Sequence, residues 1–290
     1  MIYAVTLFVF LSIASFAVVL EPSLLRYDFN VYKKLEPCSP PYNVIYKNKL
    51  KELQFVAAFH GVGVYSSTFQ MIKKTVDLFQ PEVVIVEGIH SSLGMDAPCL
   101  IKIAKTQFSQ DFQSCGESIY SIYLAHSNNF SFIGGEPDEE EIVRGCVKWG
   151  YTLQDILGFY LVRQVPQWRR EGKLEVSFDS LAEEFISVYQ ERLNLTQYTK
   201  DIFYDWYIEK TGCFFNLKNV SEESSMPLES GTFLQKISAK ITMLRDEHLQ
   251  KVIEQNINRF DRVLVVYGRA HHIIHRGALE EYFGSGKFVK

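Results

Sequence analysis

The chain has no excess of basic residues. Its 290 residues include 30 Lys and Arg against 34 Asp and Glu, which gives a formal net charge of -4. Without such an excess a protein neutralises few phosphates, so the charge balance argues against nucleic acid as a partner. The chain also lacks internal repeats and low-complexity tracts. It is 47% hydrophobic and 14% aromatic, which is enough for the core of one large domain or two small ones.

Cysteine is scarce, and no two cysteines form a C-x-x-C pair, which argues against a structural zinc site. The five cysteines are Cys38, Cys99, Cys115, Cys146 and Cys213. Because five is an odd number, at least one thiol stays free or pairs with another chain.

Residues 2–20 contain no charged side chain, and Glu21 ends this apolar run. One interpretation is a secretory signal peptide with the cleavage tripeptide Ser-Phe-Ala at positions 15–17. Another is an uncleaved membrane anchor, since ~17–25 apolar residues span a bilayer, and a third is a buried core helix. No Lys or Arg precedes the run, so the positive segment that usually opens a signal peptide is missing. We expect a secreted or membrane-anchored protein whose main domain is extracytoplasmic.

The run divides the chain into three parts. Residues 1–22 are the signal peptide or membrane anchor, residues 23–41 are a linker, and residues 42–290 are the globular domain. The linker is marked by three prolines, which are Pro37, Pro40 and Pro41.

Four short apolar runs predict buried strands, since runs that are apolar on both faces are typical of parallel strands. They cover residues 55–59, 83–86, 130–133 and 262–267. Between the first two, apolar residues recur at helical spacing as far as Pro81. This order predicts a βαβ unit, with parallel strands and a crossover helix.

Helical spacing dominates most of the remaining chain. Residues 150–230 are predicted to be a mainly helical insertion, followed by a long helix over about 233–259. The predicted fold class is α/β, with a central mixed, largely parallel sheet flanked by helices, a helical middle insertion and an N-terminal hydrophobic segment.

Three polar residues directly follow predicted strands: His60, Glu87 and His271. Open α/β sheets bind ligands outside the carboxyl ends of their strands, so these residues should meet if the strands are parallel. A lone His is often only a satisfied structural residue, but Gly61 and Gly63 after His60 allow a close approach to a bound group. Glu87 needs a metal, a cation or a proton donor, because an unpaired buried carboxylate is costly. A strand-end salt bridge would also satisfy it.

Three further residues are weaker candidates. His275 shares a helix face with His271, at a spacing used by metal ligands, but no Glu lies between them and the position also suits a solvent-facing residue. Arg245 on the long helix can hold Glu87 or clamp a substrate oxygen. Glu117 follows Gly116 at a helix start, as a second carboxylate of the site or as a first-turn residue that favours the helix dipole.

These motifs together resemble the TraB/PrgY/GumN and Tiki group of the erythromycin-esterase/ChaN-like superfamily. The resemblance is limited to short matching segments between about residues 55 and 283. Gly268-Arg269-Ala270-His271 matches the group's second G-x-x-H motif, and Glu87 matches its strand-end glutamate. Arg245 and Gly116-Glu117 also match. The group's first G-x-x-H motif is only partly matched, because residues 57–60 keep His60 but have Ala57 in place of the usual Gly.

The resemblance implies a mixed α/β fold and, from Tiki proteins, metal-dependent peptide cleavage. Erythromycin-esterase relatives open a lactone, and ChaN-like relatives bind haem. The expected function is therefore a hydrolase of a peptide or small ester. Its divalent metal (Zn, Mn or Co) would be bound by His60, Glu87 and His271, and Arg245 would stabilise the oxyanion. Without a metal, His60 would act as general base. The alternative is a non-catalytic peptide- or haem-binding protein.

Overall fold

The computed structural model describes residues 18–27, 39–60, 63–109, 112, 116–175, 177–193 and 195–289. Its centre is a six-stranded sheet in the order β4-β3-β5-β2-β1-β6. The strands are β1 (Tyr42–Lys47), β2 (Glu52–Ala58), β3 (Val83–His90), β4 (Ser131–Glu136), β5 (Arg262–Gly268) and β6 (Lys287–Val289). The four strands from β4 to β2 are parallel, and β1 and β6 add antiparallel pairs at one side. The predicted mixed, largely parallel α/β sheet is confirmed.

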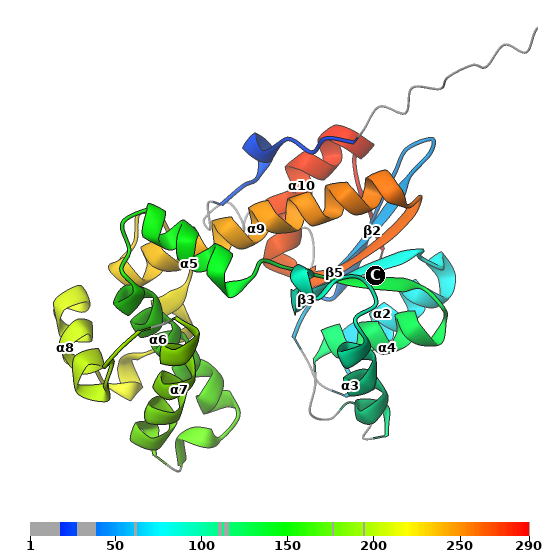
Figure 1. The fold of residues 1–290 in the computed structure, drawn as a ribbon. Helices are drawn as coiled ribbons and strands as arrows, with labels where there is room; N and C mark the ends of the chain where they lie inside the picture. The colour runs from blue at the N-terminus through cyan, green and yellow to red at the C-terminus, as the bar shows by residue number, and fades with distance from the viewer. Residues whose placement is uncertain are drawn as a thin grey trace, which may run out of the picture.

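Helices cover both faces of the sheet (Figure 1). One face carries α2 (Ser67–Phe79), α3 (Pro98–Phe108) and α4 (Glu117–Ser127), and the other carries α9 (Phe233–Arg259) and α10 (Arg269–Phe283). Alternate strand residues enter opposite cores: Phe55 packs on the α9–α10 side and Val56 on the α2–α4 side. This two-sided burial explains why the strands are continuous apolar runs.

The predicted helical insertion, residues 150–230, lies within a larger second lobe with its own core (Figure 1). Its helices are α5 (Glu139–Lys148), α6 (Leu153–Arg170), α7 (Phe178–Arg192) and α8 (Lys200–Thr211), and the first turns of α9 also pack there. Thr152 caps α6 through a reciprocal bond with Asp155, and Thr232 caps α9 in the same way with Gln235. Such boxes satisfy backbone donors that a helix start leaves free.

The segment before the sheet is packed against the domain where it is described. Val18 and Leu20 are buried, and the Gln250 side chain donates to the Leu20 carbonyl oxygen at 2.5 Å. The short helix η1 (Pro22–Leu24) follows. Residues 1–17, which carry most of the predicted signal peptide or anchor, lie outside the described residues. Within the described ranges, no helix has the length and apolar content needed to cross a membrane.

Candidate functional site

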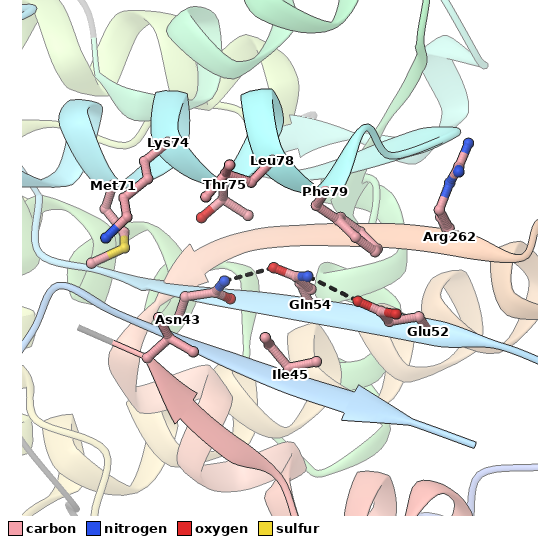
Figure 2. A pocket seen from close by; sticks show the side chains of 11 residues that line it. Asn43, Ile45, Glu52, Gln54, Met71, Lys74, Thr75, Leu78, Phe79 and Arg262 are labelled. Carbon is pink, nitrogen blue, oxygen red and sulfur yellow. Dashed lines mark hydrogen bonds between the residues drawn. The ribbon is translucent and has the colours of Figure 1, made fainter. Parts of the chain in front are cut away.

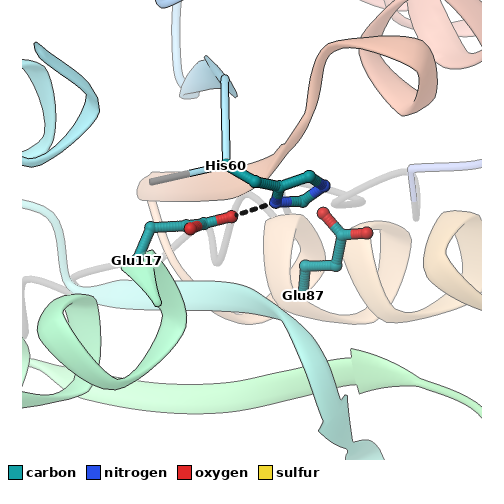
Figure 3. A group of neighbouring side chains, drawn as sticks. All are labelled: His60, Glu87 and Glu117. Atoms are coloured by element: carbon teal, nitrogen blue, oxygen red, sulfur yellow. Dashed lines mark hydrogen bonds and ion pairs between the residues drawn. The ribbon is translucent and has the colours of Figure 1, made fainter. Parts of the chain in front are cut away.

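Three side chains from separate elements meet at the carboxyl ends of the parallel strands (Figure 3). His60 lies two residues beyond β2, Glu87 lies in β3, and Glu117 is the first residue of α4. One ligand atom of each lies within 4.8 Å of the other two. The His60 side chain is 73% exposed, whereas that of Glu117 is 6% exposed. The group is therefore open to solvent on its histidine side.

The start of α4 holds the histidine in place. Gly116 is the extended N-cap residue, and Glu117 occupies the first turn, where the helix dipole favours a carboxylate. His60 Nδ1 lies 2.6 Å from Glu117 Oε1. This hydrogen bond raises the pKa of His60, although burial opposes the shift.

Glu87 accepts two hydrogen bonds and lies beside a histidine. The backbone N–H of Gly268 donates to Oε2 at 2.6 Å, the Arg245 guanidinium donates to Oε1 at 3.2 Å, and His271 Nε2 lies 3.5 Å from Oε1. Burial would raise the pKa of Glu87, but His271, Arg245 and His60 hold it well below its usual range. Glu87 is thus an ionised, oriented carboxylate. A Cβ at Gly268 would lie 3.3 Å from Glu87 Oε2, which explains the glycine in this motif.

Arg245 has a second partner that the sequence did not reveal. Its Nε donates to Glu136 Oε2 at 2.7 Å and its Nη2 to Glu136 Oε1 at 2.6 Å. Glu136 is the last residue of β4, the strand next to the one that carries Glu87. The backbone N–H of Gly88 also donates to Glu136 Oε1, at 3.3 Å. Burial opposes ionisation of Glu136, but the Arg245 charge lowers its pKa. The two-point pair fixes the guanidinium beneath the site.

His271 and His275 both contact Asp246, a buried residue of α9. His271 Nδ1 lies 2.7 Å and His275 Nε2 lies 3.0 Å from Asp246 Oδ1. Burial opposes charge on His271, yet Asp246 and Glu87 together raise its pKa to about 10. Both ring nitrogens of His271 are thus directed at carboxylates, which favour the protonated ring.

The structure changes the predicted ligand set. His271 lies beside Glu87 but outside the group of three, and Glu117 takes its place. Both ring nitrogens of His271 already face carboxylates, those of Asp246 and Glu87. His275 is completely buried, so the solvent-facing interpretation is wrong, although its shared face with His271 is confirmed by their common partner. Arg245 holds Glu87, which is one of its two predicted roles.

A separate pocket of about 280 Å³ lies between α2 and strands β1 and β2 (Figure 2). Asn43 Nδ2 donates to Gln54 Oε1 at 2.7 Å, and Gln54 Nε2 donates to Glu52 Oε1 at 3.0 Å. Glu52 begins β2, whereas His60 follows its end. The pocket therefore lies at the other end of the sheet from the candidate site.

Comparison of the chain with protein-family models, with curated protein sequences and with solved structures gave no match. The resemblance to the TraB and Tiki group thus stays a prediction from the sequence motifs. Of the residues that hold the site, sequence reasoning missed Glu136 and the role of Asp246. The available signal for Glu136 was its position at a strand end after Gly134 and Gly135.

Proposed function

We propose that the protein is a metal-dependent hydrolase that cleaves peptide or ester bonds, with one divalent ion held by His60, Glu87 and Glu117. The observation that carries this proposal is the approach of one imidazole and two carboxylates to within 4.8 Å. One nitrogen and two oxygen donors suit Zn, Mn or Co, and three protein ligands leave positions open. Held by these three residues, a divalent ion would supply a polarised scissile carbonyl group and a bound water with its pKa lowered towards ~7.

The surrounding residues prepare the donors. The Gly268 N–H, the Arg245 guanidinium and the His271 side chain keep Glu87 ionised and fix its orientation. Arg245 was predicted to stabilise an oxyanion, but it is bound by Glu136 and Glu87, so we assign it a positioning role.

Access for a substrate lies on the side of His60, the exposed member of the group. Glu87 and Glu117 form the buried floor, with side chains 13% and 6% exposed. A substrate carbonyl group that enters beside His60 would therefore reach the donors without displacing the core. An extended peptide or a small ester fits this open approach better than a ligand that needs a deep cavity.

The test is chelator-sensitive hydrolysis. The full chain is purified without chelator and incubated with a mixture of unstructured peptides, and cleavage is followed by mass spectrometry. We expect cleavage that EDTA abolishes and that Zn²⁺, Mn²⁺ or Co²⁺ restores. Glu87→Gln and Glu117→Gln should lose it, whereas Glu140→Gln, a change at a side chain that is 85% exposed, should keep it. Equal cleavage by folded Glu117→Gln and wild-type protein would contradict the proposal.

A further inference from the structure

A serine, a histidine and a glutamate outside the candidate metal site are joined by two hydrogen bonds. Ser91 Oγ lies 2.7 Å from His248 Nε2, and His248 Nδ1 lies 3.1 Å from Glu141 Oε2. The residues come from the short helix η2 (Ser91–Leu93), from α9 and from the first turn of α5. Hydrolases activate a hydroxyl by this order of contacts, in which the base touches the nucleophile and a third group orients the base.

The partners fix the tautomer of the imidazole. An ionised carboxylate only accepts hydrogen bonds, so His248 Nδ1 carries the proton that faces Glu141. In the neutral ring Nε2 then has a free lone pair, and the Ser91 hydroxyl donates to it. The ring is thus oriented to accept the serine proton.

The location also suits a reactive group. Ser91 directly follows β3, at the carboxyl end of a parallel strand, where α/β proteins place ligands. His248 lies three residues after Arg245 and so shares its face of α9. The Ser91 residue is partly exposed and the following Leu93 is 48% exposed, whereas the His248 side chain is only 16% exposed. The base is thus more shielded from solvent than the segment that carries the hydroxyl.

We propose that Ser91 is a nucleophile for small esters, activated by His248 and oriented by Glu141, and that it acts without the metal. Ser91 Oγ bonds to the ester carbonyl carbon as its proton moves to His248 Nε2. The carbon–oxygen bond to the alcohol then breaks, and the alcohol leaves with that proton. Water repeats the sequence on the acyl-serine: its proton passes to His248, its oxygen bonds to the acyl carbon, and Oγ leaves and regains the proton. The products are an alcohol and a carboxylic acid.

The test is covalent labelling of the full chain with an alkyl fluorophosphonate in the presence of EDTA. A phosphorus–oxygen bond forms at the serine and fluoride leaves, while His248 takes the hydroxyl proton. We expect one label per chain, mapped to Ser91 by peptide mass spectrometry. Chelator should not change the labelling rate, which separates this centre from the proposed metal site.

Three variants distinguish a nucleophile from a structural contact. Ser91→Ala should lose the label, and His248→Gln should slow labelling by about 10²–10⁴-fold, the usual contribution of a general base. Ser92→Ala, at the exposed neighbour that bonds to Asp138, should label like the wild type. An unlabelled wild-type Ser91, or equal rates in folded His248→Gln and wild type, would overturn the proposal. The wild-type result decides even if a variant fails to fold.

Discussion

Asp246 Oδ1 lies 2.7 Å from His271 Nδ1, and neither side chain is open to solvent, with exposures of 0% and 9%. The same oxygen also serves His275 at 3.0 Å. Asp246 therefore links two turns of α10 to α9, next to the residues that hold Glu87. A change at Asp246 should therefore affect both the stability of the domain and the position of His271 beside Glu87.

Asp246→Asn should destabilise the protein by about 3–5 kcal/mol, because removing one partner leaves the other charge buried without compensation. Urea unfolding at pH 7 measures the loss. The control is Asp77→Asn, which removes an exposed pair with Lys73 and should cost at most about 0.5 kcal/mol. Equal unfolding free energies for the two variants would show that Asp246 is not an essential partner.

Arg245 and Glu136 should behave as one unit in a double-mutant cycle. Arg245→Met and Glu136→Gln each leave a partner buried without its counterpart, so each single change should be costly. The double variant should be less destabilised than the sum of the two, with a coupling free energy of about 2 kcal/mol. Additive losses in urea unfolding would mean that the two-point pair contributes little.

Gly268→Ala tests how closely the backbone approaches the site. A Cβ there would lie 3.3 Å from Glu87 Oε2 and 3.6 Å from His60 Nε2. We expect metal affinity to fall about 10-fold, as it does when an outer partner of a ligand is disturbed. Glu140→Gln, at a side chain that is 85% exposed, is the control. Isothermal titration of both variants decides, and equal affinities would contradict the account.

His272 should make the protein less stable in acid. Burial lowers its pKa to about 3, and it lies between the hydroxyl groups of Tyr42 at 3.0 Å and Tyr46 at 2.9 Å. The unfolded chain takes up this proton near pH 6.5, so this contribution to stability is complete above that pH and is lost as the pH falls towards 3.

By pH 4.5 the loss should reach about 2–3 kcal/mol relative to pH 7. His272→Gln has no imidazole to titrate, so its stability should fall less by that amount over the same interval. Urea unfolding at both pH values gives the difference. Parallel pH profiles for the variant and the wild type would refute a neutral buried His272.

The parallel strands could be predicted because a strand that is buried on both faces has an unbroken apolar sequence. Strand β1 was not predicted, although Tyr42, Val44 and Tyr46 alternate along it and are all buried. Six residues are a weak signal on their own, and the strands and the helix that bury them lie elsewhere in the chain. The same limit hid the partners of His272, which lie 226 and 230 residues away along the chain.

The location of the site could be predicted from the sequence, but the contacts that its residues make could not. Strand ends indicated His60, Glu87 and His271, and a helix start indicated Glu117. Asp246 raises the pKa of His271. Glu136, 109 positions from Arg245 along the chain, holds the guanidinium that contacts Glu87. Local spacing does not contain those contacts, so the exchange of His271 for Glu117 required the structure.

The most direct test of the central claim is titration of chelator-stripped protein with Zn²⁺ and Mn²⁺. We expect one site in the wild type and in Glu140→Gln. We expect at least about 100-fold weaker binding in Glu117→Gln, since disturbing even an outer partner of a ligand costs about 10–100-fold in affinity. Wild-type affinity in folded Glu117→Gln, or no binding by the wild type, would contradict a metal centre at His60, Glu87 and Glu117.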